Sequence, residues 1–327
     1  MIIKQREKPV RLLAHEAGMR RVPKTHPKYP QIEKEYYRLH YGYKGEEAMD
    51  YYSSFLPHEN YKVLHGLRIQ DTKGRHFQMD SLLLSPTHGV ILDSKYINGV
   101  LEFDLDNSIL IRHKDEGHER FGDPFSQLAR QKCQLEGVID NLKYPPLPIY
   151  TQVVLTHNQA RLHPNTPTLK SQLSFHTNLP LRMQRINDLN KNTVLTNKEL
   201  QKLARTLNRK HESDSFNFME YYGLSNSEIL KGVICSNCLF SPMRKYLQVW
   251  KCPGCMSVER ASIVPTLFDF KYLGLGDTIT NQELRDFIYI DSVFVASRLL
   301  ASQNFPHKGN KKGRTYLLEF ENKKPPP

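Results

Sequence analysis

QMDSLLLSPTHGVILDSKYINGV, at residues 78 to 100, is the stretch from which the architecture of this chain can be worked out. It belongs to two apolar runs with the length and composition of β-strands, His76–Leu84 and Gly89–Lys95, separated by turn residues at Ser85–His88. Further β-rich runs lie on both sides, at Tyr61–Ile69, Val100–Leu105 and Ile109–Arg112. The sequence therefore predicts a sheet rich in hairpins.

Helices are expected before and after this sheet. The string KGEEAMDYYSSF, residues 44 to 55, has apolar residues at helical spacing, and an amphipathic helix follows from Pro124 to about Leu142. Ile149–Leu155 then has the pattern of another buried strand. Hairpins followed by a helical crossover and a further strand predict an α/β domain with a mixed sheet.

Three charged side chains of the stretch at residues 78 to 100 are expected to converge. Asp93 and Lys95 point to one face of their strand because side chains alternate. If the two strands are antiparallel neighbours, Asp80 lies beside Asp93. Carboxylates can hold Mg²⁺, which polarises a phosphoryl oxygen and lowers the pKa of a bound water, while Lys95 would orient that water or neutralise developing charge. The arrangement suits metal-assisted phosphodiester hydrolysis, although a D-x-K strand taken alone is more often solvated surface.

Motifs in three segments stand in a recognisable order. They are KGEEAM at 44–49, the stretch at 78–100 and DPFSQLARQ at 123–131. In this order they resemble the nuclease-related domain, NERD, a branch of the PD-(D/E)xK nuclease superfamily. The family has a Gly-Glu at the start of the first helix, a Q-x-D strand, an acid-x-Lys strand followed by Gly, and a Pro-x-x-Gln helix. The resemblance covers about residues 44 to 155 and implies a restriction-endonuclease-like core with a mixed sheet.

The resemblance also implies a catalytic set and a magnesium site. The matching positions are Glu46, Gln78, Asp80, Asp93, Lys95, Gly99 and Gln127. From these, the expected catalytic residues are Glu46, Asp80, Asp93, Lys95 and Gln127, and the three acids among them are the expected ligands of Mg²⁺ or Mn²⁺. Glu47 is the alternative for the helix acid. The family usually has Glu at the position of Asp93, whose side chain is one methylene shorter.

Four of the five cysteines form two CxxC pairs, with thirteen residues between the pairs. These pairs are Cys235 with Cys238 and Cys252 with Cys255. Two such turns place four thiolates for tetrahedral Zn²⁺, and Gly254 is expected to let the backbone fold around the sulfurs. A redox dithiol is the weaker alternative, because no thioredoxin-like context accompanies the pairs. The module resembles a zinc ribbon, which would stabilise a small fold or dock a protein partner.

Five segments are expected along the chain. They are a basic N-terminal extension at 1–43, the nuclease-like domain at 44–190, a helical linker at 191–230, the zinc ribbon at 231–264 and a helix-turn-helix-like region at 270–327. Pro23, Pro27 and Pro30 are expected to interrupt any long helix in the extension. Capping boxes at Thr196–Glu199 and Thr280–Glu283 predict the starts of two further helices.

The C-terminal region is expected to be winged-helix-like. A helix at Asn281–Tyr289 and a second helix capped by Ser292 precede the basic string KGNKKGRTYLLEF at 308–320, which has the pattern of a turn entering a strand. The basic side chains expected to bind nucleic acid are Lys308, Lys311, Lys312 and Arg314. The alternative is a helical packing appendage with a solvated basic hairpin.

The charge balance favours a polyanionic partner. The chain has 46 Lys and Arg against 34 Asp and Glu, a formal net charge of +12. No stretch is apolar over the length that crosses a bilayer, and the N-terminal MIIKQREKPV lacks the apolar core of a signal peptide. A cytoplasmic protein with no membrane partner is expected, and the CxxC pairs fit a reducing compartment.

Three functions are compatible with these features. The favoured one is a metal-dependent nuclease that hydrolyses phosphodiester bonds of DNA. The alternative is a non-catalytic nucleic-acid-binding or partner-docking protein in which the nuclease fold has decayed. Retention of every acid and of the lysine argues against decay, since a dead scaffold needs none of them. A third possibility is a structural subunit whose zinc ribbon recruits another enzyme.

Overall fold

The structure is a computed structural model that describes residues 1–327 except 57–60, 167–170, 261–262, 311–312 and 321–327. It consists of two compact units. The first comprises Met1–Lys8 and His40–Asp214, and the second comprises Pro9–Leu39 and Ser215–Pro327. Within the part of the chain that the structure describes, no helix is long and apolar enough to cross a membrane.

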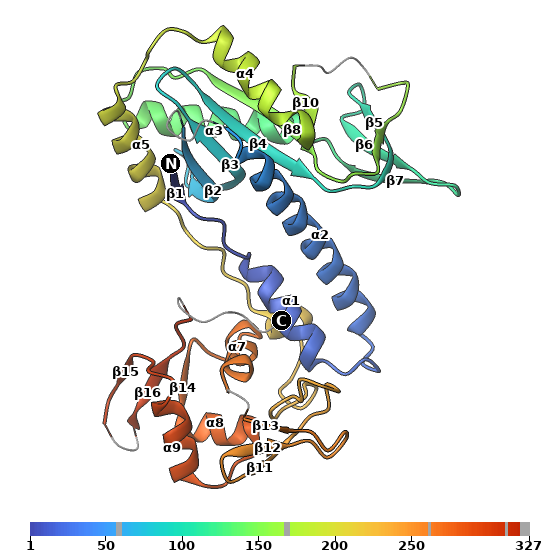
Figure 1. Ribbon diagram of the computed structural model, residues 1–327, viewed down its shortest axis with the longest axis vertical. Helices are drawn as coiled ribbons and strands as arrows, with labels where there is room; N and C mark the ends of the chain where they lie inside the picture. Colours follow the sequence, from blue (N-terminus) through green and yellow to red (C-terminus); the bar gives the residue numbers. More distant parts are fainter. Residues whose placement is uncertain (57–60, 167–170, 261–262, 311–312, 321–327) are drawn as a thin grey trace. The chain divides into compact units, whose positions relative to one another are not determined.

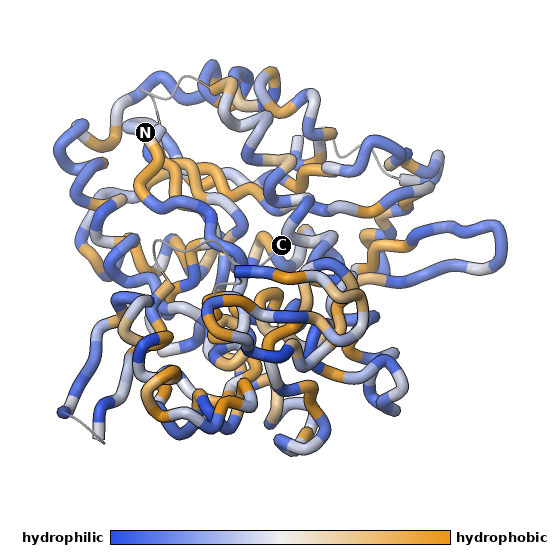
Figure 2. The backbone as a smooth tube through the Cα atoms, turned by 60° about the horizontal axis from the view of Figure 1, so that its bottom comes forward, coloured by the Kyte–Doolittle hydropathy of each residue, from blue (hydrophilic) through white to orange (hydrophobic). Residues whose placement is uncertain are grey.

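The first unit is built on a six-stranded mixed sheet with the strand order β1-β2-β3-β4-β8-β10 (Figure 1). Its strands are β1 (Ile2–Lys4), β2 (Lys62–Gln70), β3 (His76–Leu84), β4 (Gly89–Lys95), β8 (Ile149–Leu155) and β10 (Leu173–Phe175). The neighbours β2, β3 and β4 are antiparallel, whereas β8 is parallel to both β4 and β10. Figure 2 shows hydrophobic segments running through the central strands, as expected for a sheet that is covered on both faces.

Helices cover both faces of this sheet. On one face, α3 (Pro124–Asn141) and α5 (Asn197–Arg209) bury apolar side chains in a core that includes Ile91 of β4. A second core holds the neighbouring Leu92 together with residues of α2 (Tyr29–Ser53) and of α4 (Leu179–Leu189). Successive side chains of a strand point to opposite faces, so the two cores lie on opposite sides of β4. The sheet is the middle of three layers.

A smaller sheet has the strand order β7-β6-β5-β9. Its strands come from the segments that follow β4 and β8 in the sequence. Its strands are β5 (Gly99–Asp104), β6 (Ile109–His113), β7 (His118–Gly122) and β9 (Ala160–Leu162). One face of this sheet is apolar and forms a small core that contains Leu101, Phe103 and Leu110. The side chains that alternate with these apolar residues point away from that small core.

The second unit contains the cysteine module and the C-terminal region. Its elements are α1 (Val10–Arg21), α6 (Phe218–Tyr222), β11 (Arg244–Tyr246), β12 (Val249–Lys251), β13 (Val258–Glu259), α7 (Val264–Tyr272), β14 (Thr278–Thr280), α8 (Asn281–Ile288), α9 (Val293–Ala301), β15 (His307–Lys308) and β16 (Thr315–Leu317). The strands form two antiparallel sheets, ordered β11-β12-β13 and β14-β16-β15. Helix α7, strand β14, helices α8 and α9 and the β15–β16 hairpin follow the order of a winged helix. The predicted fold class is confirmed.

Residues of the predicted basic extension are divided between the two units. Residues 1–8 supply β1 to the first unit, whereas α1 packs in the core of the second. Arg21 of α1 is buried and donates through Nε to Oδ2 of Asp269 in α7 at 2.7 Å, and Arg20 donates to Oδ1 of the same carboxylate. These basic residues therefore have a structural role in the second unit.

The predicted start of the helix around Glu46 was wrong. Helix α2 spans Tyr29–Ser53, rather than beginning near Lys44. Pro30 does not interrupt it, because the proline lies in the first turn, where a missing N–H removes no intrahelical hydrogen bond. Gly45 consequently lies inside the helix and not at its start. The two predicted capping boxes are both present, with their reciprocal hydrogen bonds.

Candidate functional sites

The β3–β4 hairpin places Asp80 next to Asp93. The antiparallel pairing reaches Ser81 opposite Leu92, and the next residues in the same register are Asp80 and Asp93. Ser94 holds the first of these acids, because its backbone N–H and its hydroxyl donate to Oδ2 of Asp80 at 2.9 and 3.2 Å. The two strands thus bring together the two acids that the sequence singled out.

Asp93 lies between Lys95 and Gln127. The Nζ atom of Lys95 is 2.7 Å from Oδ2 of Asp93, and Nε2 of Gln127 on α3 donates to Oδ1 at 3.2 Å. Asp93 is only 2% exposed. The positive charge of Lys95 lies close to Oδ2 of Asp93 and neutralises the carboxylate. No described residue, however, donates a well-aligned hydrogen bond to this oxygen.

The charges of these side chains perturb one another. Burial raises the pKa of Asp93 to about 6; Lys95 opposes this shift, and Asp80 adds to it. Burial by itself would lower the pKa of Lys95, but the negative charges of Asp93, Asp80 and Glu46 outweigh it and raise that pKa. Lys95 therefore keeps its proton at neutral pH.

Glu46, and not Glu47, is the helix acid that faces the others. Glu46 is partly buried on α2, whereas Glu47 is exposed. Burial raises the pKa of Glu46 to about 8; the charge of Asp80 contributes in the same direction, and Arg6 opposes it. The side chains of Glu46 and Asp80 are therefore close enough to repel each other.

Gly45 allows helix α2 to approach the ends of β4 and β8. A Cβ atom on Gly45 would lie 2.7 Å from Cβ of Tyr96 and 2.9 Å from Oγ1 of Thr156. Both distances are shorter than van der Waals contact, so only glycine fits without a shift of the helix. The glycine of the Gly-Glu pair thus serves close packing, which brings Glu46 towards the strand that carries Asp93.

Arg6 is the residue of this site that the sequence analysis missed. Its side chain is 6% exposed and its guanidinium donates to the carboxylates of Glu46 and Asp50. It also donates to the backbone oxygen of Asp80 and to the hydroxyl of Ser81, both at 2.9 Å. No motif pointed to Arg6, which is one of many basic residues near the N-terminus.

The three predicted magnesium ligands do not form a preassembled cluster. Among the described residues, two groups of at least three metal-ligating side chains have their ligand atoms within 4.8 Å of one another, and neither contains Glu46, Asp80 or Asp93. Arg6 and Ser94 bind Glu46 and Asp80 instead, and Lys95 pairs with Asp93. The acids converge on one region, but a cation would have to draw them closer.

The first of the two groups consists of Cys235, Cys238, Cys252 and Cys255, the predicted zinc ligands. The Sγ atoms of Cys235 and Cys255 lie 3.7 Å apart, those of Cys238 and Cys252 lie 3.5 Å apart, and none of the four is in a disulfide. The Ser257 hydroxyl and the Asn237 amide lie 3.2 and 3.4 Å from Sγ of Cys255 and lower the pKa of that thiol to about 5. The cluster could bind zinc.

The role expected for Gly254 needs correction. The left-handed backbone conformations next to the cysteine pairs occur at Leu239 and Met256, one residue after the last cysteine of each pair, with φ of 61° and 62°. Gly254 is needed for space, because a Cβ atom there would lie 3.2 Å from the ring of Phe240. Trp250 is buried in the core beside Cys235 and Cys252, in agreement with a packing role.

The predicted basic residues of the C-terminal hairpin can be placed only in part. Lys308 on β15 is exposed, whereas Arg314 is partly buried and its Nε atom lacks a hydrogen-bond partner among the described residues. Lys311 and Lys312 lie outside the described residues. The structure therefore places one exposed cation at the predicted surface.

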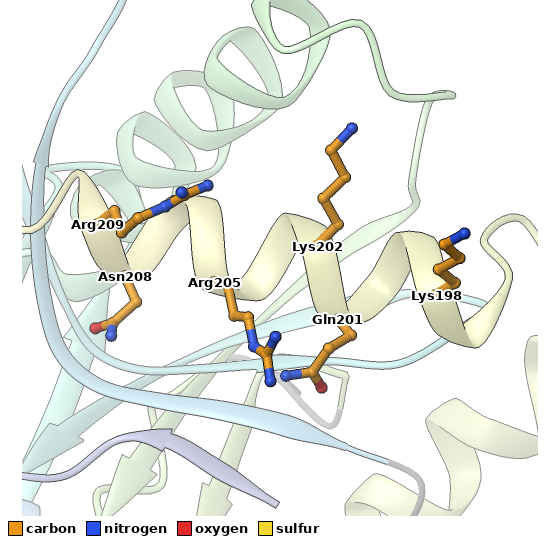
Figure 3. A pocket seen from close by; sticks show the side chains of 6 residues that line it. All are labelled: Lys198, Gln201, Lys202, Arg205, Asn208 and Arg209. Carbon is orange, nitrogen blue, oxygen red and sulfur yellow. The ribbon is translucent and has the colours of Figure 1, made fainter.

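A second basic surface, which the sequence analysis missed, lies on α5. We call it the α5 basic face; it consists of Lys198, Lys202, Arg205 and Arg209, and Figure 3 shows these side chains projecting from the helix. None of them forms an ion pair with a described residue. The opposite side of the helix buries Leu200, Leu203 and Leu207 in the core. The spacing of the basic residues along α5 was the signal that could have identified this face.

Comparison with known proteins finds a family match for part of the chain. No curated protein and no solved structure matches this chain. The family model of the nuclease-related domain, NERD, matches residues 41–156, and this stretch contains all five side chains predicted for the acidic site, Glu46, Asp80, Asp93, Lys95 and Gln127.

Proposed function

We propose that the stretch matching the nuclease-related domain hydrolyses phosphodiester bonds of DNA with the aid of Mg²⁺ or Mn²⁺. The observation that carries the proposal is the ion pair of Asp93 and Lys95, with 2.7 Å between Oδ2 and Nζ, next to Asp80 on the adjacent strand. These residues lie within the family match. Such a combination suits phosphodiester cleavage, because acids can hold a metal ion and a positive charge stabilises the negative charge that develops on the phosphate.

The residues present fit a hard divalent cation. Glu46, Asp80 and Asp93 would hold it through carboxylate oxygens, the ligand type that Mg²⁺ prefers. The buried Oδ2 atom of Asp93 contacts Nζ of Lys95 at 2.7 Å without an aligned hydrogen bond, and a carboxylate oxygen has lone pairs with which it can also bind a metal ion. Mg²⁺ bound there would polarise a phosphoryl oxygen and lower the pKa of the attacking water.

The chain's own residues would have distinct tasks. Lys95, with its raised pKa, would remain protonated and place a positive charge beside the reacting phosphate. Gln127 would orient Asp93 through the hydrogen bond to Oδ1. Arg6 would act as a positioning residue, since it holds Glu46 and Asp50 on one face of α2.

Two basic surfaces support a nucleic-acid substrate. The α5 basic face offers four cations without ion-pair partners among the described residues, and the sequence of the C-terminal region at 270–327 contains the proposed contacts Lys308, Lys311, Lys312 and Arg314. Contacts of this kind release counterions from the phosphate backbone and strengthen binding. DNA is preferred to RNA as the substrate because of the family resemblance.

The remaining modules would support this activity without taking part in the chemistry. We assign structural Zn²⁺ to the four cysteines, the zinc ribbon to residues 231–264 and a nucleic-acid or protein contact to the helix-turn-helix-like region at 270–327. A cytoplasmic location agrees with cysteines that are free of disulfides.

The test is a cleavage assay on the full chain with DNA and RNA substrates, in Mg²⁺, in Mn²⁺ and in chelator. Cleavage of DNA is expected with either ion and should stop in chelator. Asp80→Ala and Lys95→Ala should each lower the rate at least about a hundredfold. Asp104→Ala, which removes an acid at the end of β5 and outside the site, is the control and should cleave normally.

Two outcomes would overturn the proposal. Equal cleavage by the wild type, Asp80→Ala and Lys95→Ala would mean that the activity is a contaminant or that the site lies elsewhere. Binding of DNA without cleavage under any of the metal conditions would favour the decayed-nuclease alternative.

A further inference from the structure

The second group of converging metal-ligating side chains lies in the small sheet of the first unit and has no part in the proposed nuclease site. It consists of Glu102 on β5, His113 at the end of β6 and His163 directly after β9. One ligand atom from each residue lies within 4.8 Å of the others. We call this group the Glu-His-His cluster.

The register of three strands brings the Glu-His-His cluster together. In the antiparallel pair β5–β6, His113 lies opposite Val100, two residues from Glu102 and therefore on the same face. In the parallel pair β5–β9, Leu101 aligns with Leu162, so the next residues in register are Glu102 and His163. The opposite face of β5 is apolar and buried, which leaves these three side chains together on the outer face.

The distances distinguish a metal site from a simple hydrogen-bonded pair. Oε2 of Glu102 is 2.7 Å from Nε2 of His113 and 3.6 Å from Nδ1 of His163. The first distance is a hydrogen bond, whereas the second is too long for one. Two ligands of a tetrahedral zinc ion, each about 2.1 Å from the metal, lie about 3.4 Å apart. The second histidine therefore stands at the separation of a co-ligand.

The second imidazole has an unprotonated ring nitrogen near Glu102. Nδ1 of His163 accepts a hydrogen bond from the backbone N–H of Asn165 at 3.2 Å, so this nitrogen carries no proton, and a bound ion would take the lone pair in exchange for this hydrogen bond. The rings of His113 and His163 are stacked, with centroids 4.6 Å apart. The three side chains are 18 to 38% exposed, so an ion can enter from solvent.

We propose that the Glu-His-His cluster binds a divalent transition-metal ion, with Zn²⁺ as the best fit to two imidazoles and a carboxylate. Three protein ligands leave one coordination position for water. Because the ligands come from three strands, the ion clamps the segment after β9 onto the β5–β6 hairpin. This inference does not depend on the proposed nuclease activity.

The test is the zinc content of the full chain, measured by elemental analysis after loading with Zn²⁺, dialysis and removal of any affinity tag. Two equivalents are expected in the wild type, one in the cysteine cluster and one in the Glu-His-His cluster. Glu102→Gln, His113→Phe and His163→Ala should each reduce the content to one. His113→Phe retains an aromatic ring for stacking, so its loss of zinc reports on ligation rather than on packing.

A matched control is available in the same unit. His76 pairs with Glu212 at 2.5 Å, but these residues are not part of any three-ligand group among the described residues. His76→Ala should retain both equivalents of zinc. Once the cysteine cluster has been loaded, a further equivalent of Zn²⁺ should raise the melting temperature of the first unit in the wild type and in His76→Ala, but not in His163→Ala.

The proposal is wrong if the wild type holds a single equivalent that Cys252→Ser removes. It is also wrong if the three cluster variants retain as much zinc as the wild type, since the second ion then lies elsewhere.

Discussion

Arg6 donates through Nη2 to Oδ1 of Asp50 at 2.8 Å, although 44 residues separate them in the chain. The same guanidinium reaches Oδ2 of Asp50 through Nε and Oε2 of Glu46 through Nη1. With only 6% of its side chain exposed, Arg6 is a buried cation that compensates two acids of α2. Its loss would leave the negative charge of Asp50 without this partner in a poorly solvated site.

The first prediction is that Arg6→Gln destabilises the protein by about 3–5 kcal/mol, the cost of breaking a buried ion pair. Arg38→Gln is the control, because Arg38 also donates twice to one carboxylate, that of Glu35, but is 66% exposed. Its loss should cost at most about 1 kcal/mol. Urea unfolding of both variants measures the difference. Equal, small losses of stability would show that burial does not strengthen the contribution of the Arg6 ion pairs.

The second prediction concerns pH. The pKa of Glu46 is raised to about 8 in the folded state, so the folded protein holds a proton that the unfolded chain releases at lower pH. The free energy of unfolding of the metal-free protein should therefore fall as pH rises from about 6.5 to 8, by at most about 1.4 kcal/mol per pH unit. Mg²⁺ binds deprotonated carboxylates, so its apparent affinity should increase over the same range.

Thermal unfolding in chelator, from pH 6.5 to 8.5, tests this prediction. Glu46→Gln removes the titrating group and should flatten the dependence in this window. The histidines with lowered pKa, such as His88 at about 4, titrate below the window and act equally in both proteins. Parallel curves for the wild type and Glu46→Gln would mean that the carboxyl ionises at its ordinary pH.

The third prediction is that Gly45→Ala moves helix α2 away from the strands. The added methyl would lie 2.7 Å from Cβ of Tyr96, and overpacking of this kind costs about 1–3 kcal/mol. Cleavage should fall as well, because Glu46 moves with the helix. Gly42→Ala is the matched control, since a Cβ atom at that position of α2 meets nothing within 4 Å and alanine favours a helix. If both variants are equally stable and active, the close approach of the helix at Gly45 is not needed for stability or cleavage.

The fourth prediction is that Cys252→Ser removes one equivalent of zinc and unfolds the cysteine module. The only tryptophan, Trp250, is 1% exposed and packs in that core, so its fluorescence should shift to longer wavelength when the module opens. Cys133→Ser, at an exposed cysteine outside the module, should change neither reading. Detection of two disulfides by mass spectrometry would eliminate the zinc assignment.

The fifth prediction concerns the α5 basic face. Replacing Lys198, Lys202, Arg205 and Arg209 by Gln should weaken DNA binding and reduce the salt dependence, by a slope of roughly 0.9 for each lost phosphate contact. Neutralising Lys308 and Arg314 tests the C-terminal hairpin in the same way. Lys191→Gln is the control, because its charge is already paired with Asp188. An unchanged slope in either set would remove that surface from the proposed interface.

Local signals were sufficient for much of the fold. Strands β3 and β4 span the same residues as the predicted runs, His76–Leu84 and Gly89–Lys95, because turn residues and apolar runs act over a few positions. The two-residue period of a strand also placed Asp93 and Lys95 on one face. The capping boxes and the CxxC pairs are equally local, and the structure contains both.

Other features depend on residues that are distant in sequence. The start of α2 at Tyr29 was missed because a proline in the sequence indicates a break, whereas its place in the first turn makes it harmless. The Glu-His-His cluster needs the register of three strands, and no spacing in the sequence encodes that alignment.

The sequence by itself determined which residue types are present and which of them share a strand or helix face: the two acids and the lysine of the hairpin, the four thiols and the amphipathic helices. Only the tertiary structure decided that Glu46 rather than Glu47 approaches Asp80, and that Arg6 binds both Glu46 and Asp50. The reason is physical. Periodicity and capping arise from interactions over a few residues, whereas the position of a buried charge depends on how sheet and helix pack, which involves the whole unit.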